Sequence, residues 1–223
     1  MKQKVQFNEQ RYCLAFLGSG DQERVKIILN LIGSNKKVLD VGCGRGEIGY
    51  LLKQKNNQVF GVDISPGAVR AACRAGVAAK TIDLEEAKIP FRQKFDVVLA
   101  GEVIEHIFDT ESFLKKLSGA LKDGGDLIIT TPNLASLGRR LLLLVGQNPL
   151  VETDINPDLN RAGHIRYFVK KTLFTILAKN GFRIVNFYSD IVNFCPSGKV
   201  NSRFLAKIFP SLGKTLIVWA TKT

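Results

Sequence analysis

The stretch "VLDVGCGRGEIG", from Val38 to Gly49, joins an apolar strand to a turn that is dense in glycine. Such turns after strands commonly hold a nucleotide-like ligand. The spacing Gly42-x-Gly44-x-Gly46 differs from the dinucleotide fingerprint G-x-G-x-x-G, whose third glycine is replaced by Glu47. It also lacks the lysine and hydroxyl residue of a phosphate-binding loop. The turn is therefore not built in either standard way for a pyrophosphate or a triphosphate.

Three aspartates narrow the ligand further. Asp40 precedes the turn, where a carboxylate repels phosphates but can pair with an ammonium group. Asp63 ends the second predicted strand, 21 residues after Gly42, where an acid can hold both ribose hydroxyls. Asp83 ends the third predicted strand and can accept a hydrogen bond from an adenine amino group. These acids fit a ligand with an ammonium group, a ribose and an adenine but no phosphate, and S-adenosylmethionine is such a molecule.

Strands and helices alternate up to residue 133. Hydrophobic patterning and turn residues predict strands at 36–41, 58–64, 77–83, 94–101 and 126–133, and helices at 21–32, 46–55, 65–76 and 110–125. Ser65 and Thr110 are the expected N-caps of the last two helices, and a glycine stop is expected at the end of each. This order predicts an α/β fold with a Rossmann-like, doubly wound, mostly parallel sheet that binds ligands at the carboxyl ends of its strands.

The remainder, from residue 134, has a different pattern. We expect a short amphipathic helix at 135–147, an irregular loop of about 20 residues, a helix at 169–181 that stops at Gly181, and strands at 182–190 and 214–223. The last two strands are expected to form an antiparallel edge pair, which brings the sheet to seven strands. We therefore predict a single domain over 1–223, with 134–168 as a small lid insertion on the substrate side.

Charge is unevenly distributed along the chain. The net charge is +12, and residues 134–223 contribute +9 of it. This excess suits an anionic substrate, a membrane surface or nucleic acid, or it is simply the solvated surface of a basic protein. Nucleic acid is disfavoured, because no Lys/Arg run is interleaved with aromatic residues. Peripheral membrane contact and a lipid-like acceptor stay open.

Four cysteines, at positions 13, 43, 73 and 195, show no metal-ligand spacing and are expected to be reduced thiols. No apolar run has the length of a membrane span, and residues 1–20 lack the apolar region of a signal peptide. Together these features predict a cytoplasmic protein.

Five motifs in order carry a family resemblance. The stretches "VLDVGCGRG", "GVDIS", "IDLEEAKIPF", "FDVVLAGEVIEH" and "LKDGGDLIITTPN" resemble the motifs of the class I S-adenosylmethionine-dependent methyltransferases over about residues 36–133. Downstream, "HIRYFVKKTLFTILAKNGFRIV" is similar to the tail of the subgroup that includes the ubiquinone-biosynthesis O-methyltransferases. "ACRAGVAAKTIDLEE" and "PNLASLGRRLLLLVGQNPL" are similar to methyltransferase-like proteins linked to methionine biosynthesis.

The resemblance implies cofactor roles by position. It places Asp40, Gly42, Cys43 and Gly44 at the methionine end, Asp63 and Ile64 at the ribose and adenine, Asp83 and Leu84 beside the adenine, and Ala100, Gly101 and Glu102 on the floor near the methyl group. A packing role is expected for Cys43 rather than a nucleophilic one. The implied activity is methyl transfer from S-adenosylmethionine, which leaves S-adenosylhomocysteine, to an oxygen or nitrogen of a small acceptor. The alternative is a cofactor-binding partner protein that regulates a biosynthetic enzyme.

Candidate catalytic residues follow the fourth strand and end the long loop. The stretch "EVIEH" allows three roles. His106 could act as a general base. Alternatively, Glu102, Glu105 and His106 could bind a divalent cation, as the similar stretch does in the ubiquinone O-methyltransferases, or the three residues could only shape the turn. His164 would enter the acceptor pocket if the loop folds over the sheet. Arg161 and Arg166 beside it could bind an acidic acceptor.

Overall fold

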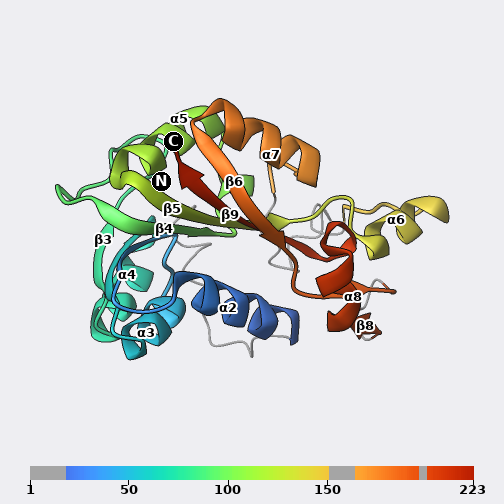
Figure 1. Ribbon diagram of the computed structural model, residues 1–223, viewed down its shortest axis with the longest axis horizontal. Helices are drawn as coiled ribbons and strands as arrows, with labels where there is room; N and C mark the ends of the chain where they lie inside the picture. The colour runs from blue at the N-terminus through green and yellow to red at the C-terminus, as the bar shows by residue number, and fades with distance from the viewer. Residues whose placement is uncertain (1–18, 151–163, 196–199) are drawn as a thin grey trace.

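A computed structural model describes residues 19–150, 164–195 and 200–223, and these form a three-layered α/β/α arrangement (Figure 1). The central sheet has seven strands in the order β3-β2-β1-β4-β5-β9-β6. Its strands are β1 (Lys37–Val41), β2 (Gln58–Asp63), β3 (Ala78–Thr81), β4 (Phe95–Gly101), β5 (Leu121–Pro132), β6 (Phe182–Tyr188) and β9 (Thr215–Lys222). The first five run parallel, and the order reverses between β1 and β4, which is where such folds bind ligands.

Helices cover both faces of this sheet. The main helices are α2 (Ser19–Ile32), α3 (Glu47–Gln54), α4 (Pro66–Arg74), α5 (Thr110–Ala120), α6 (Leu137–Leu144), α7 (Lys170–Lys179) and α8 (Arg203–Ile208). Helices α5 and α7 lie on one side of the sheet, and α2, α3 and α4 lie on the other (Figure 1). Each side closes over its own apolar cluster, as expected for strands buried on both faces.

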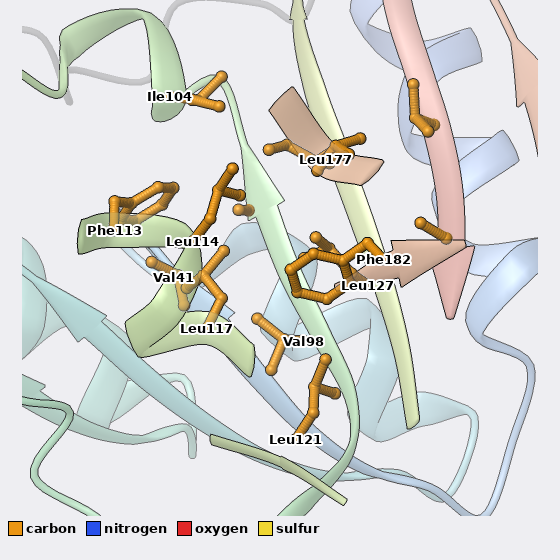
Figure 2. Packing of buried hydrophobic residues seen from close by; sticks show 14 of the residues in the cluster. Val41, Val98, Ile104, Phe113, Leu114, Leu117, Leu121, Leu127, Leu177 and Phe182 are labelled. Atoms are coloured by element: carbon orange, nitrogen blue, oxygen red, sulfur yellow. The ribbon is translucent and has the colours of Figure 1, made fainter. Parts of the chain in front are cut away.

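Figure 2 shows part of the cluster beneath α5 and α7. Phe113 and Leu117 of α5 and Leu177 of α7 pack on strand residues that include Val98 and Leu127, all essentially inaccessible to solvent. This packing holds the carboxyl ends of β1, β4 and β5 in a fixed relation, and those ends carry the predicted site residues.

Of the two predicted N-cap residues, one is confirmed and one is wrong. Ser65 is the N-cap of α4, and its hydroxyl accepts a hydrogen bond from the Ala68 N–H at 3.2 Å. Thr110 is not the N-cap of α5; Asp109 is, because its carboxylate accepts the Ser112 N–H at 3.0 Å. An aspartate one residue earlier can satisfy the same free N–H groups as a threonine.

Two element boundaries also differ from the prediction. Helix α5 ends at Ala120 instead of running to the glycines at 124–125, since Leu121 already pairs with Phe95 in the sheet. The glycines instead lie in an irregular stretch of β5, where the register with β4 shifts. Strand β3 ends at Thr81, so Asp83 lies in the following loop and not at a strand end.

The C-terminal part completes the sheet. Strand β9 pairs antiparallel with both β5 and β6, and β6 forms the edge, so the predicted antiparallel edge pair is confirmed. Helix α6 lies within the predicted insertion 134–168, whose residues 151–163 fall outside the described residues. Helix α8 and the two short strands β7 (Val192–Asn193) and β8 (Asn201–Ser202), which lie between β6 and β9, were not predicted from the sequence. Among the described helices, none is long and apolar enough to span a membrane.

Candidate active site

The glycine turn is held against the neighbouring strands by its backbone. The N–H groups of Gly42 and Cys43 both donate to the carbonyl of Val62 in β2, at 2.8 and 3.0 Å. Gly42 has φ +71°, and a Cβ there would come within 2.4 Å of the Val103 side chain. Left-handed backbone conformation and this close approach together explain why glycine is needed at the first position of the turn.

Asp63 links the turn to the end of β2. Its carboxylate accepts the N–H of Gly44 at 2.9 Å through Oδ2 and the N–H of Ser65 at 2.9 Å through Oδ1. The side chain is buried, with 3% of the residue exposed. A carboxylate oxygen can accept two hydrogen bonds, which is the chemistry that a ribose diol requires. The structure thus orients the residue that was predicted to hold the ribose.

Asp40 is a buried acid at the carboxyl end of β1. Burial, and then the charges of Asp63 and Glu47, raise the pKa of its carboxyl group to about 8. Within the described part of the chain, no side chain or N–H group donates a hydrogen bond to it. A buried carboxylate in this state gains the most from a cationic ligand, because the cation compensates for lost hydration. This suits the ammonium group predicted from the sequence.

Cys43 packs inside the turn. A Cβ on Gly61 of β2 would lie 2.7 Å from the Cys43 sulfur, so the two backbones approach closely only because residue 61 is glycine. Burial, followed by the charge of Asp40, raises the pKa of the Cys43 thiol well above its ordinary value. A buried thiol without a nearby cation is not an activated nucleophile. The geometry supports the packing role predicted for this residue.

The predicted adenine-side residues lie just after β2 and in the loop that follows β3. Ile64 follows Asp63 directly and is partly exposed, while Leu84 is buried. Asp83 is partly exposed, and its carboxylate accepts the Glu85 N–H at 2.9 Å, which fixes its orientation in the loop. Ala100 is fully buried at the end of β4, and a Cβ on Gly101 would meet no atom closer than 3.8 Å.

Glu102 is held in an unusual conformation just after β4. It has φ +56°, rare for a residue with a side chain. Its N–H donates to the Thr130 carbonyl, its Oε1 accepts the Thr130 hydroxyl at 2.8 Å, and its Oε2 lies 3.2 Å from the Arg24 guanidinium. These contacts fix a carboxylate at the floor of the site.

Arg24 of α2 is the functional candidate that sequence reasoning missed. It lies 3.5 Å from Asp21 as well as beside Glu102. Burial lowers the pKa of this guanidinium, but the charges of Glu102 and Asp21 outweigh that effect and the net shift is upward. The only signal for it in the sequence is its i, i+4 spacing to Ile28 and onward to Ile32, which places a basic residue at the border of the apolar face of α2.

Glu105 lies deeper than Glu102. Its Oε2 accepts the Thr131 hydroxyl at 3.0 Å, whereas its buried Oε1 has no hydrogen-bond partner within the described structure. Burial, and then the charge of Glu102, raise the pKa of Glu105 to about 8. The two glutamates of "EVIEH" therefore differ: Glu102 is paired with a cation, and Glu105 retains its proton near neutral pH.

The two histidines of the chain lie close together at the carboxyl end of β4. The N–H groups of Ile165 and Arg166 donate to the Glu105 carbonyl at 3.1 Å, which lays the end of the long loop across the turn after β4. The ring of His164 thereby comes to 4.9 Å from the ring of His106. The structure thus places His164 beside His106, and its entry into an acceptor pocket stays a prediction.

The cation hypothesis takes a different form in the structure. Ligand atoms of Glu105, His106 and His164 lie within 4.8 Å of one another, a spacing that a metal ion can bridge. In the sequence, cation binding by Glu102, Glu105 and His106 is only one of three alternatives. Glu102 is instead committed to Arg24 and Thr130, so His164 takes its place in the group that could hold a cation.

The structure does not test whether Arg161 and Arg166 bind an acidic acceptor. Arg166 donates to the Ile107 carbonyl at 3.0 Å and to the Phe108 carbonyl, and its guanidinium lies over the Phe108 ring. The structure therefore gives Arg166 partners that stabilise the loop. Arg161 lies outside the described residues.

A cavity of about 460 Å³ lies away from these residues, between the 88–94 segment and α5. Lysines and apolar side chains line it, and none of the predicted site residues does. We assign it no part in methyl transfer, since the convergent acids and histidines lie at the strand ends instead.

Comparison with known proteins agrees with this geometry. A family model described as a methyltransferase domain matches residues 8–186. The ubiquinone biosynthesis O-methyltransferase of Bradyrhizobium diazoefficiens is 40% identical over 111 residues, which cover 47% of this chain and 43% of the relative. The human mitochondrial ubiquinone biosynthesis O-methyltransferase is 30% identical over 159 residues, covering 66% and 42%. The chain thus spans less than half the length of these relatives.

A solved structure shares the fold. The magnesium protoporphyrin IX methyltransferase of Synechocystis PCC 6803, solved with bound S-adenosylhomocysteine, superposes with a TM-score of 0.65 at 19% identity, covering 97% of this chain and 93% of that one. The family match covers most of the sequence, and the sheet order agrees with the motif order. The chain therefore belongs to the methyltransferase domain family, as its resemblance to the class I S-adenosylmethionine-dependent methyltransferases predicted.

Proposed function

We propose that the chain binds S-adenosylmethionine at the glycine turn and transfers its methyl group to an oxygen of a small, anionic or lipid-like acceptor. The observation that carries this proposal is the pair of hydrogen bonds from Gly44 and Ser65 to Asp63, which joins the turn to the end of β2. The buried acids Asp40 and Asp63 suit a donor that carries an ammonium and a sulfonium charge and no phosphate.

Each part of the donor has a matching group. Asp40 would pair with the ammonium group and Asp63 with the ribose hydroxyls. Arg24 is the largely buried cation beside Glu102, and its guanidinium would meet the carboxylate of the methionine part. Ala100, Gly101 and Glu102 would lie under the methyl group at the end of β4, with Leu84 and Asp83 beside the adenine.

Catalysis of this transfer needs alignment more than charge stabilisation. The donor sulfur becomes neutral as the methyl group leaves, so holding the acceptor atom in line accounts for much of the rate, roughly 7–11 kcal/mol in well-oriented systems. An oxygen acceptor also loses a proton, and His106 with His164 would receive it. A divalent cation on Glu105, His106 and His164 is the second candidate, because it would lower the pKa of a bound hydroxyl group.

Oxygen is preferred over nitrogen because the two curated relatives described above are named as O-methyltransferases. The alternative of a regulatory partner protein has less support, since those relatives are named for enzymes. The cytoplasmic location, the single domain over 1–223 and the lid role of 134–168 are part of this proposal.

The proposal is tested in two steps. Calorimetry with S-adenosylmethionine, S-adenosylhomocysteine, NAD and ATP should give heat with the first two only; heat with NAD or ATP alone would overturn it. Incubation with methyl-labelled donor and separated lipid and aqueous cell extracts should then label a hydroxyl-bearing compound. Binding without any labelled product, together with co-purification of a second enzyme, would favour the regulatory alternative.

A further inference from the structure

Apolar side chains are exposed together at one end of the molecule, on α6 and α8. Leu144 is 81% exposed and Phe204 is 70% exposed, and each has large apolar neighbours that are at least half exposed. We call this the α6–α8 face; its apolar members are Leu143, Leu144, Val145, Phe204, Ile208 and Phe209. Several such residues on adjacent elements mark an interaction surface more often than a scatter of single ones.

The two helices belong to one structural unit. Both contact β7, and a Cβ on Gly138 of α6 would lie 3.4 Å from the Asn193 carbonyl of β7. Leu142 of α6 and Ala206 of α8 are buried, so each helix has an inner side against the protein and an outer apolar side. Figure 1 shows α6 and α8 at the same end of the molecule, beyond the sheet.

The charged residues of the segments that form α6, β7, β8 and α8 are all cationic. The sequence contains no aspartate or glutamate in 134–150 or in 191–223, the segments that form α6, β7, β8 and α8. Arg140 and Lys207 are exposed on the two helices. Arg203 of α8 lies 3.7 Å from Glu23 of α2 and is partly neutralised.

This end also adjoins the candidate active site. Helix α6 follows directly on β5, whose end carries Thr130 and Thr131, the partners of the two site glutamates. The Asn133 amide donates to the carbonyls of Ser211 and Gly213, both at 2.9 Å, and so fastens the segment after α8 to the same strand end. A surface bound here would lie beside the acceptor side of the site.

We propose that the α6–α8 face docks on the surface of an anionic lipid bilayer. Exposed aromatic and aliphatic side chains enter the interfacial region of a membrane, and cations at the same level are attracted to anionic headgroups. A symmetric contact between two copies through this face would bring like charges together, which disfavours it. The face recognises the headgroup charge and the acyl boundary, and no specific lipid is implied.

Sedimentation of the full chain with vesicles tests this docking, without cofactor or acceptor. One set of vesicles contains phosphatidylcholine only, and in the other one third is replaced by phosphatidylglycerol. We expect binding to the second set at about 0.1 M NaCl and much weaker binding at about 1 M NaCl. The double variant Leu144→Ser/Phe204→Ser should bind at least about tenfold more weakly, and Lys207→Glu about fivefold more weakly.

Two control variants change the same kinds of side chain outside the α6–α8 face. Tyr50→Ser removes a half-exposed aromatic residue on α3, and Lys115→Glu reverses an exposed charge on α5; both should bind as the wild type does. Circular dichroism melts check that each variant is folded. Failure of the wild type to bind anionic vesicles would overturn the proposal, and so would equal losses in the controls. A wild-type dimer that the double variant converts to monomers would also overturn it and assign the face to self-association.

The outcome is separable from the proposed methyl transfer. Vesicle binding requires neither the glycine turn nor Asp63, so a protein that binds S-adenosylhomocysteine but no vesicles contradicts only this inference. Conversely, vesicle binding without cofactor binding contradicts only the proposed function.

Discussion

The carboxyl ends of β1, β2 and β4 and the α6–α8 face have opposite chemistry. At the strand ends, Asp40, Asp63 and Glu105 are at most 4% exposed, and packed strands and hydrogen bonds to Asp63 and Glu105 fix their positions. On the α6–α8 face the charged groups are cationic and exposed, and large apolar residues surround them.

This difference separates two kinds of recognition. Buried acids lose hydration whether or not a ligand is present, so a cation of the right shape gains strongly from binding them. Exposed cations and apolar side chains keep their water until a surface displaces it, and they select charge and hydrophobicity rather than shape. One molecule thus combines a shape-selective site for a cationic donor with a less selective face for an anionic surface.

The largest effect is expected at the histidines. His106→Ala should lower the rate of methyl transfer by about 100-fold or more, because it removes either the proton acceptor or a cation ligand. The affinity for S-adenosylhomocysteine should stay within about twofold of the wild type, measured by calorimetry. Equal loss of both quantities would show that His106 only supports the turn.

A metal titration separates the role of proton acceptor from that of cation ligand. Mn²⁺ or Zn²⁺ is added to the wild type and to His164→Ala, and the melting temperature is followed. A rise in the melting temperature of the wild type alone favours the cation.

Asp40→Asn should have opposite effects on binding and on stability. It removes the partner of the ammonium group, so the affinity for S-adenosylmethionine should fall more than about tenfold. Without ligand, the variant should be more stable than the wild type by about 1 kcal/mol or more at pH 8.

The pH dependence of this gain follows from the raised pKa. In the folded protein Asp40 keeps its proton up to about pH 8, whereas the unfolded chain releases it near the ordinary aspartate pKa of 3.8. The unfolded state therefore binds fewer protons between these pH values, and wild-type stability falls as pH rises through that window. Urea unfolding at pH 5 and pH 8 should show a larger gain for Asp40→Asn at pH 8. A gain that does not depend on pH would contradict the buried, protonated state of Asp40.

Gly42→Ala tests whether the turn needs its backbone conformation. A methyl group there meets Val103 at 2.4 Å in a residue with φ +71°, so we expect a loss of about 1–3 kcal/mol in the free energy of unfolding. Adding Val103→Ala relieves the contact but not the backbone strain, and should restore only part of the stability. Gly119→Ala is the matched control, because a Cβ at that position would meet no atom within 4 Å.

The smallest effect is expected at Cys43. Cys43→Ala should leave methyl transfer within about twofold of the wild type while costing about 1 kcal/mol in stability through lost packing. In the native wild type, iodoacetamide should modify the exposed Cys73 and spare the buried Cys43, as mass spectrometry of the digested protein would reveal. Rapid alkylation of Cys43 would contradict its packing role.

Local patterns predicted the first half of the fold well. Alternating apolar strands and capped helices indicated the parallel sheet and the position of Asp63, because both depend on hydrophobic periodicity and turn residues that lie close together in sequence. The cap at Asp109 was missed since Thr110 is also a good cap, and only the hydrogen bond to Ser112 decides between them.

Long-range contacts could not be predicted in the same way. The meeting of His106 and His164 depends on hydrogen bonds from residues 165–166 to Glu105, across about 60 residues of chain. The pairing of Arg24 with Glu102 joins α2 to the end of β4, and nothing in the spacing of either residue indicates it. The short α8 and β7–β8 elements were missed because a six-residue helix and two-residue strands are too brief to show periodicity.

The most direct test of the central claim is calorimetric titration of S-adenosylhomocysteine into the wild type, Asp63→Ala and Asp96→Ala. Asp96 is the matched control, because its carboxylate also accepts a backbone N–H, that of Lys37, but lies near the amino end of β4, away from the glycine turn. We predict measurable affinity for the wild type, a similar value for Asp96→Ala, and a loss of about 100-fold for Asp63→Ala. No binding by the wild type, or an unchanged affinity in a folded Asp63→Ala, would contradict the account.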